Sequence, residues 1–220
     1  EQDVAAAGAV CRRRGVLFLV DAAQTAGHVP LEPGKWGCTM LAAPGHKGLL
    51  GPHGTGALWV RSGVTLAPLR QGGTGSASES MFQPRMMPDS LESGTLNLPG
   101  IAGLKAGMRF ALAHRREAHE TTAALCGMMR EALQNMTNVR VYTKAGASLL
   151  SFNVEGMASQ VVAAALDEQD IAVRGGLHCA PGTHRFLGTL NIGAVRVSPG
   201  LMNTAADAKR LIDAVWKIAR

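Results

Sequence analysis

The sequence contains few aromatic residues, 4% of its 220 positions, and only 17% of its residues are charged. The basic residues behind the net charge of +6 are scattered, apart from short runs at 12–14 and 115–116. A nucleic-acid surface needs a concentrated basic patch, and single-strand binding usually adds stacking aromatics, so this composition argues against one. No apolar run is long enough for a membrane span and no signal peptide is recognisable, so we expect no membrane association.

Cysteine is also scarce, with four residues at Cys11, Cys38, Cys126 and Cys179. None forms a CxxC pair, and no Cys/His grouping has zinc-ligand spacing, so we expect no metal site. Unpaired cysteines in a sequence of this kind are typical of a reducing compartment, and we expect a cytoplasmic location.

Apolar residues are abundant at 46%, which is typical of a packed globular protein. The chain starts with Glu1, and its first residues read as the end of a helix, because Val4, Ala7, Val10 and Cys11 have helical spacing before a stop at Gly15. We therefore expect a piece of a longer protein.

Apolar, β-branched runs predict strands at residues 16–21, 38–44 and 55–61, and then a long Gly/Ser/Thr/Pro-rich loop follows to Pro99. A loop of that length in a compact domain is usually functional. Pro99 opens a helical stretch that forms either two helices or one long bent helix. The remainder alternates short strands (139–142, 148–156, 171–174, 194–199) with helices at 158–170 and from about Thr204. This order predicts an α/β domain at residues 1–110 and a smaller α+β domain at 111–220.

Two polar positions follow the first two predicted strands. Asp21 ends VLFLVD, and Lys47 lies one short turn after CTMLAAP, in the segment PGHKGLLGP. If these strands are neighbours, both side chains emerge at the carboxyl edge of the sheet, where α/β proteins bind ligands. Asp21 could cap the next turn or accept a hydrogen bond from a protonated ring nitrogen, with Gln24 donating to a ring oxygen. Lys47 could be a surface charge or an amine that attacks aldehydes, and His46 beside it could bind an anion.

Three further candidates lie later in the chain. Cys179, in RGGLHCAPGTHR, is surrounded by glycine, proline, histidine and arginine, a setting that favours a reactive thiolate. The other three cysteines fall in helix or strand patterns, where cysteine acts as a small apolar residue. Arg196 lies inside the apolar strand AVRVSP and needs an anionic partner, from the protein or from a substrate carboxylate. Thr95, in ESGT, could bind a phosphate or simply form a turn.

The motifs VDAAQ, GHKGLLGPHGTGALWV, LESGTLN, VRGGLHCAP and VRVSPGLMNT follow one another along the chain. In this order the sequence resembles the C-terminal portion of the class V aminotransferase family of pyridoxal-phosphate (PLP) enzymes, and within it the cysteine desulfurases and selenocysteine lyases. The resemblance implies an α/β, aspartate-aminotransferase-like fold, known as PLP-dependent transferase fold type I. Residues 1–110 would be the remainder of the large PLP-binding domain, and 111–220 the small C-terminal domain.

The resemblance also implies roles for the polar residues around the cofactor. Lys47 would form the Schiff base with PLP, and Asp21 would pair with the pyridinium nitrogen and keep the ring an electron sink. Gln24 would bond the ring hydroxyl and His46 the phosphate. Thr95 would reach the phosphate of the neighbouring subunit, so that each active site is shared in a homodimer.

For the substrate, the resemblance implies that Arg196 holds the carboxylate of L-cysteine. Cys179 would attack the substrate sulfur, which leaves a persulfide on the enzyme and releases L-alanine, and an acceptor protein could then receive the sulfur. Other members of the family are aminotransferases or selenocysteine lyases, and an inactive truncated fragment is a further alternative. The chain departs from the family pattern at Pro44, where many relatives have Ser. The glycine-rich phosphate turn and the ring-stacking histidine of the family's N-terminal half are not identifiable.

Overall fold

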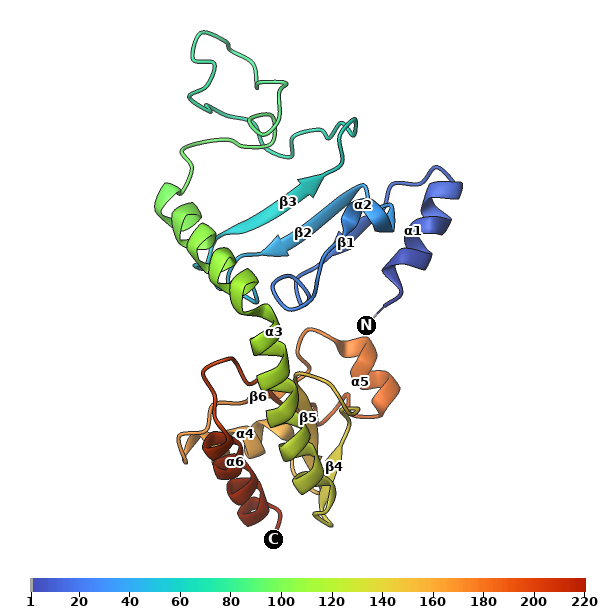
Figure 1. Ribbon diagram of the computed structural model, residues 1–220, viewed down its shortest axis with the longest axis vertical. Coiled ribbons are helices and arrows are strands. Elements are labelled where there is room, and N and C mark those ends of the chain that lie inside the picture. Colours follow the sequence, from blue (N-terminus) through green and yellow to red (C-terminus); the bar gives the residue numbers. More distant parts are fainter. Residues whose placement is uncertain (1) are drawn as a thin grey trace. The chain divides into compact units, whose positions relative to one another are not determined.

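The computed structural model describes residues 2–220 of the chain, which forms two compact units, Glu1–Arg115 and Arg116–Arg220 (Figure 1). The boundary falls inside α3 (Leu98–Gln134). This helix is continuous over 37 residues, which decides between the one-helix and two-helix interpretations of the sequence after Pro99. The domain boundary expected near residue 110 lies in the same helix.

The first unit is built on a three-stranded sheet in the order β1-β2-β3. β1 and β2 are parallel, with Asp21 opposite Ala42, whereas β3 runs antiparallel to β2. The elements of this unit before α3 are α1 (Val4–Arg13), β1 (Leu19–Asp21), α2 (Pro33–Trp36), β2 (Met40–Pro44) and β3 (Gly56–Val60). The expected parallel neighbours are therefore present, although each strand is shorter than its apolar run.

One face of this sheet is covered and the other is open. The N-terminal part of α3 contributes Leu104 to a small core with Leu41 and Ala43 of β2 (Figure 1). On the opposite face, Leu19 and Leu58 are 50% and 49% exposed. β1 is therefore buried on one face at most, because no described segment of the unit packs over the other side.

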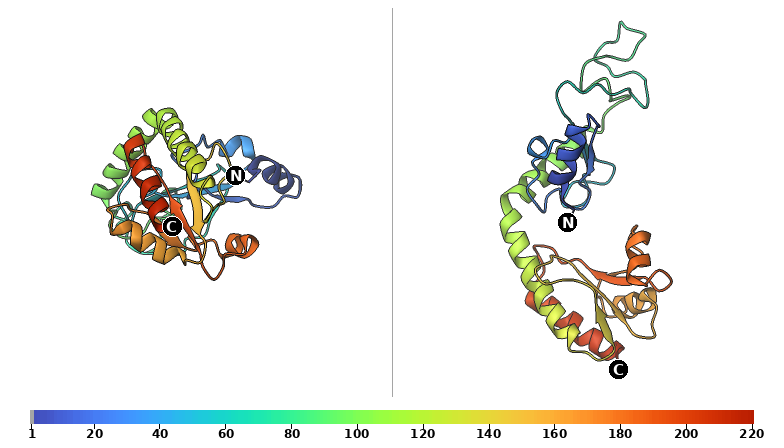
Figure 2. Two further views of the ribbon diagram at one scale, coloured as in Figure 1. Left: turned by 90° about the horizontal axis from the view of Figure 1, so that it is seen from below. Right: turned by 90° about the vertical axis from the view of Figure 1, so that its right-hand side faces the viewer.

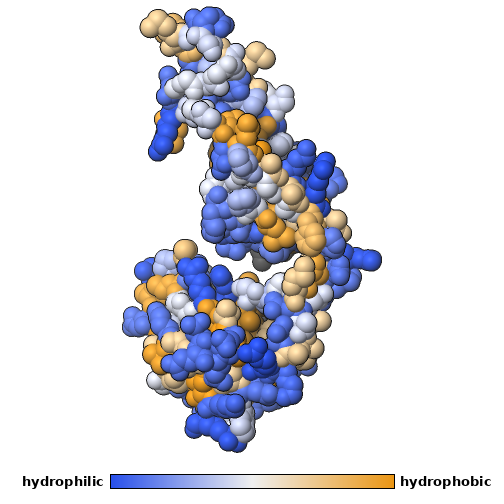
Figure 3. Space-filling model, turned by 90° about the vertical axis from the view of Figure 1, so that its left-hand side faces the viewer, coloured by the Kyte–Doolittle hydropathy of each residue, from blue (hydrophilic) through white to orange (hydrophobic). Residues whose placement is uncertain are grey.

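The segment between β3 and α3 contains no helix or strand, as its composition predicts. Several of its large apolar side chains point into solvent: Leu69, Met81, Phe82, Met86 and Met87. Apolar surface of this kind is visible at the end of the molecule formed by this loop (Figure 3). Pairs of neighbouring exposed apolar residues, such as Met81 with Phe82 and Met86 with Met87, commonly mark a surface that another protein segment covers.

The second unit contains a four-stranded sheet in the order β4-β5-β7-β6, in which every neighbouring pair is antiparallel. Its core includes Leu150, Phe152 and Val195, each fully buried, and α6 lies beside the C-terminal half of α3 (Figures 1 and 2). The elements are β4 (Val139–Val141), β5 (Leu150–Val154), α4 (Ser159–Asp167), β6 (Arg174–Gly176), α5 (Pro181–Leu187), β7 (Ala194–Val197) and α6 (Ala205–Ile218).

Two local expectations need correction, and one is confirmed. The strand expected at 171–174 instead begins at Arg174 and continues through two glycines, and the short helices α2 and α5 were not foreseen. Thr204 is the N-cap of α6, as its position predicts. Across residues 2–220, the helices fall short of the combined length and apolarity that a bilayer crossing requires.

Candidate active site

Two loops meet at the carboxyl edge of the first sheet. The loop after β1 contains Gly27, and the loop after β2 contains Gly48. A Cβ added to Gly27 would lie 1.9 Å from the carbonyl oxygen of Gly48, and one added to Gly48 would lie 2.4 Å from that of Ala26. Only glycine permits this approach. It holds the segment after Asp21 against the segment that carries Lys47.

The carboxylate of Asp21 is fixed by the turn that follows β1. Its Oδ1 accepts a hydrogen bond from the backbone N–H of Ala23 at 2.8 Å. The side chains of Asp21 and Gln24 are exposed, so both present polar atoms to solvent at this edge. The turn interpretation of Asp21 is therefore correct, and it leaves the second carboxylate oxygen available to a ligand.

The loop that carries Lys47 is closed by backbone hydrogen bonds. The N–H of Leu50 donates to the carbonyl of Lys47 at 2.9 Å, and the N–H of Gly51 donates to that of Gly45 at 2.7 Å. His46 and Lys47 are both exposed. The ring of His46 stacks on His53 with 4.7 Å between ring centroids, a contact that the sequence analysis missed. The two histidines are seven residues apart in a glycine-rich loop, and that spacing carries no recognisable signal.

An open cavity of about 540 Å³ lies over the uncovered face of the same sheet. Asp21 is in its wall, and most of the remaining wall consists of small or apolar residues of the three strands. Glu92, three residues before Thr95, also lines it. Thr95 itself is exposed in the long loop, and no side-chain hydrogen bond is found for it among residues 2–220.

In the second unit, Cys179 occupies a strained turn between β6 and α5. His178 and Cys179 have φ values of 52° and 59°, and the N–H of Ala180 donates to the carbonyl of Leu177 at 2.8 Å. Two consecutive left-handed residues other than glycine cost about 1–2 kcal/mol each. Such strain persists only where the surrounding structure imposes it, and it is concentrated at functional sites. The turn leaves the thiol of Cys179 exposed.

The ring of His178 ties this turn to the sheet. Its Nε2–H donates to the carbonyl oxygen of Arg174 at 3.0 Å. Burial lowers the pKa of His178, and the positive charges of Arg196, His184 and Arg174 lower it further, against the opposing effect of the bond to Arg174. His178 is therefore neutral at pH 7, inside a group of cationic side chains.

Arg196 lies in β7, directly opposite Ser151 of β5 and Arg174 of β6. Like charges directly opposite in an antiparallel pair repel each other. The Nε of Arg196 is buried and has no hydrogen-bond partner among residues 2–220, and neither arginine joins an ion pair in that range. An unpaired buried donor beside a second guanidinium is suited to an anion that arrives with a ligand.

Burial makes two of the remaining cysteines poor nucleophiles. Burial raises the pKa of Cys126 to about 11 and also raises the pKa of Cys38. Both side chains are buried, as their strand and helix patterns predict, and Cys11 is half-buried on α1. Within residues 2–220, no three His, Cys, Asp or Glu side chains converge as they would around a metal ion.

The candidate residues thus form two groups. Asp21, Gln24, His46 and Lys47 lie at one edge of the first sheet, and Cys179 and Arg196 lie in the second unit with Arg174, His178 and His184. The arginine and the two histidines around Cys179 could be found in the sequence, since all three fall within RGGLHCAPGTHR.

Comparison with known proteins agrees with this arrangement. The model of the family "Aminotransferase class-V" matches residues 1–211. A probable cysteine desulfurase of Methanothermobacter thermautotrophicus is 35% identical over 99% of this chain and 57% of that protein. Cysteine desulfurase CsdA of Escherichia coli is 31% identical over 97% of this chain and 54% of that protein. The crystal structure of E. coli CsdA superposes with a TM-score of 0.89 at 29% identity, over 98% of this chain and 54% of that chain.

The chain belongs to the class V aminotransferase family. Its fold is that of the PLP-dependent transferases of fold type I, as in the apo cysteine desulfurase of Thermococcus onnurineus NA1, with a TM-score of 0.82 at 28% identity. The chain spans about half the length of the curated relatives it matches. The expected family and fold are therefore confirmed.

The cofactor of this family is PLP, and the residues present fit it. An exposed lysine follows β2, a carboxylate with one unbonded oxygen follows β1, and the loops that carry them are packed together by glycines. The orphaned Nε of Arg196 fits the carboxylate of an amino-acid substrate. The amine, the carboxylate and the guanidinium match the aldehyde, ring nitrogen and substrate carboxylate that such an enzyme must bind.

Proposed function

We propose that the complete protein is a PLP-dependent cysteine desulfurase that converts L-cysteine to L-alanine and transfers the sulfur to Cys179. The observation that carries this proposal is an exposed cysteine on a strained turn whose neighbours Arg174 and Arg196 lack anionic partners. The relatives described as cysteine desulfurases support the same reaction. In this assignment residues 1–110 belong to the large PLP-binding domain and 111–220 to the small C-terminal domain.

When bound, PLP supplies an electron sink that makes the bonds at the substrate's α- and β-carbons labile. Lys47 holds the cofactor through its amine, Asp21 keeps the ring nitrogen protonated, Gln24 donates to the ring oxygen, and His46 contacts the phosphate. Each of these groups has its place at the carboxyl edge of the first sheet. The tight packing of the two loops limits the freedom of Asp21 and Lys47 before the cofactor binds.

In the second unit, Arg196 binds the substrate carboxylate and Cys179 acts as the nucleophile. The sulfur of Cys179 bonds to the substrate sulfur while the C–S bond of the substrate breaks, and the carbon takes a proton to complete alanine. The thiol must be deprotonated to attack. The strained turn presents Cys179 away from the core, which suits a group that must accept sulfur and then release it.

A direct test measures alanine and sulfide formed from cysteine by the complete protein and by Cys179→Ala and Cys179→Ser. We expect both variants to lose sulfide release almost completely while keeping the visible absorbance of the lysine-bound cofactor. Lys47→Ala should lose that absorbance. Unchanged sulfide release in Cys179→Ala would favour another class V reaction, which selenocysteine, or alanine with a keto acid, would then identify. Absence of cofactor absorbance in the complete parent protein would favour a protein without PLP-dependent activity.

We also propose a cytoplasmic homodimer in which Thr95 contacts the phosphate bound by the neighbouring subunit. The exposed apolar side chains of the long loop, including Met81 and Phe82, support a contact between copies. Free cysteines support a reducing location. Sedimentation of the complete protein tests the dimer: Met81→Asp combined with Phe82→Asp should dissociate it and weaken cofactor binding. A dimer that survives this double change places the interface elsewhere.

A further inference from the structure

The chain around Cys179 is free of acidic residues. Between Asp170 and Asp207 the sequence contains no Asp or Glu, whereas it contains three arginines and two histidines. None of the ion pairs found among residues 2–220 involves these arginines. Arg185 is exposed and lies six residues after Cys179, on α5. The segment that carries the thiol is therefore positively charged, and its arginines are not neutralised by an ion pair among residues 2–220.

The helix that follows Cys179 also presents an apolar side chain to solvent. Phe186 of α5 is 87% exposed, and Leu190 and Ile192 beyond the helix are partly exposed. Fully burying a side chain of this size is worth about 1.5–3 kcal/mol. Burial of this phenylalanine by a partner would therefore stabilise a complex by a similar amount. Aromatic residues of this kind are typical anchors of interfaces.

The orientation of α5 is fixed from its buried side. His184 is 4% exposed, and its Nδ1 is 2.8 Å from the hydroxyl of Thr189. The N–H of Thr189 also donates to the carbonyl of His184 at 2.8 Å. With His184 held inward, the next two residues, Arg185 and Phe186, are exposed. α5 begins two residues after Cys179, so Phe186 lies within roughly 10 Å of it along the helix axis.

We propose that α5 and the Cys179 turn form the docking surface for a polypeptide sulfur acceptor, with acidic residues beside its cysteine and an apolar side chain for Phe186. This rests on the proposed desulfurase function. The acceptor thiolate attacks the outer sulfur of the Cys179 persulfide, the S–S bond breaks, and Cys179 leaves as a thiolate. The proton lost by the acceptor thiol balances the one taken up by Cys179, so no oxidant or reductant is consumed.

The reaction itself requires contact at this place. The two sulfur atoms must approach to about 3–3.5 Å. A specific interface covers about 800 Å² on each partner, so a patch centred on Cys179 includes α5. Because the Cys179 turn and α5 carry arginine and no acid, charge complementarity selects an acidic partner and speeds its association.

The test uses the complete protein in a Cys11→Ser background, where Cys179 is the exposed thiol among residues 2–220. Cys179 is converted to its mixed disulfide with thionitrobenzoate, and release of the chromophore by cysteine peptides is timed. One peptide has Asp and Glu beside the cysteine and a nearby Leu, and its matched isomer has Lys in place of both acids. The loading needs no cofactor and no desulfurase activity.

We expect the acidic peptide to react about tenfold faster than its lysine isomer, an advantage that falls as salt is raised. Arg185→Glu should reverse the preference, and Phe186→Ala should slow the acidic peptide several-fold. Lys144→Glu and Val161→Ala, which change exposed residues outside the Cys179 turn and α5, serve as controls and should leave both rates unchanged. Alanine formation with a small thiol reductant should be the same in the Arg185 and Phe186 variants as in the parent.

Equal rates for the two peptides, or variants of α5 that behave like the controls, would overturn the docking surface. So would a change of oligomeric state in Phe186→Ala, because α5 would then be covered by a second copy or by another part of the protein. If the protein prefers the acidic peptide but has no desulfurase activity, the docking surface stands and the proposed reaction is refuted. The two ideas can therefore fail separately.

Discussion

The two units are similar in length but differ in how much apolar surface they bury. Among the described residues of Glu1–Arg115, the core cluster contains six buried residues, three of them alanines: Ala22, Ala26, Leu41, Ala43, Leu49 and Leu104. In Arg116–Arg220 the corresponding cluster contains sixteen, including Phe152 and five leucines. The second unit therefore has the larger share of its own stabilisation. The first leaves one face of its sheet open beside Asp21, and that face is available for a ligand or for further chain.

The units also position their functional groups differently. In the first, glycines bring two backbones into contact, and Asp21 and Lys47 follow from that packing. In the second, His178 and Cys179 adopt left-handed backbone conformations that glycine would adopt more easily. Close packing therefore places the proposed cofactor-binding groups, whereas a strained turn on a large core presents the proposed nucleophile. A unit with a large core can sustain such strain, because the core supplies the compensating free energy.

The largest expected effect distinguishes the two cores. Phe152→Ala should destabilise the second unit by about 3–5 kcal/mol, since the side chain is fully buried. Leu41→Ala in the first unit should cost about 2 kcal/mol, because the neighbouring small side chains and open face allow the site to relax. Hydrogen exchange read by mass spectrometry during urea unfolding measures each unit separately. Equal loss of protection in both units after either change would show that they unfold as one body.

Much of the first site could be predicted from the sequence. Apolar runs ending at Asp21 and before Pro44 predicted two strands, and their parallel pairing, now observed, places Asp21 and the loop of Lys47 at one edge. The close approach of Gly27 and Gly48 could not be predicted, since it depends on contacts between loops that are distant in sequence.

The second site was predicted by residue type but not by geometry. IAVR reads as a strand, yet β6 begins at Arg174 and includes Gly175, a residue of low strand propensity. Glycine is needed there because an added Cβ would lie 2.5 Å from the carbonyl oxygen of Ser159 in α4. Pro181 at the first position of α5 is a helix-start signal, but seven residues are too few to show helical periodicity.

Replacing one glycine by alanine in each unit should change the stability of the two units by intermediate amounts and in opposite directions. Gly48→Ala should destabilise the first unit by about 1–3 kcal/mol and weaken cofactor binding, since its Cβ would clash with the carbonyl oxygen of Ala26 and the ring of His28. Gly127→Ala, in the part of α3 that belongs to the second unit, meets nothing within 4 Å and should stabilise that unit by about 0.5–1 kcal/mol. Urea midpoints of the two variants measure both signs. A neutral Gly48→Ala would mean that the two loops separate freely, and the account of how Asp21 and Lys47 are positioned would be wrong.

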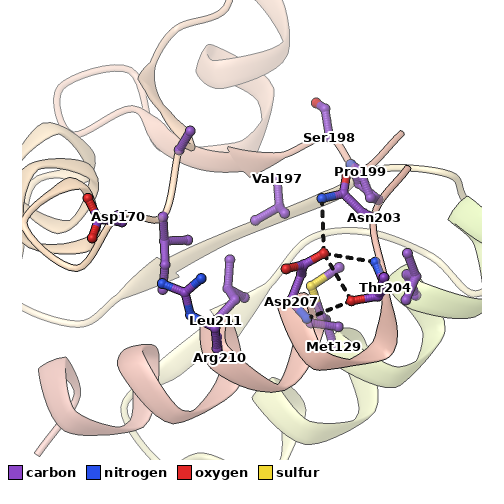
Figure 4. A pocket seen from close by; sticks show the side chains of 14 residues that line it. Met129, Asp170, Val197, Ser198, Pro199, Asn203, Thr204, Asp207, Arg210 and Leu211 are labelled. Carbon is purple, nitrogen blue, oxygen red and sulfur yellow. Dashed lines mark hydrogen bonds between the residues drawn. The ribbon is translucent and has the colours of Figure 1, made fainter. Parts of the chain in front are cut away.

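The smallest effect concerns the acid stability of the second unit. At the start of α6, Oδ2 of Asp207 accepts from the backbone N–H of Thr204 at 2.8 Å, and Oγ1 of Thr204 accepts from the N–H of Asp207 at 3.3 Å (Figure 4). The bond from the backbone of Thr204, followed by those from its hydroxyl and from Asn203, holds the pKa of Asp207 below its ordinary value. Because the carboxyl binds its proton more weakly in the folded state, its stabilising contribution is present above the ordinary pKa of an aspartate. That contribution is lost as the pH falls through the lowered value.

Asp207→Asn should therefore reduce the stability of the second unit at neutral pH and make its unfolding free energy less dependent on pH in the acid range. Thr204→Ala should weaken the same dependence only in part, because the backbone N–H remains as a donor to the carboxylate. Urea unfolding followed by hydrogen exchange at several acid pH values gives the slope for each unit. The first unit should keep its own slope in both variants. An unchanged slope in the second unit after Asp207→Asn would place the source of its acid sensitivity at another carboxylate.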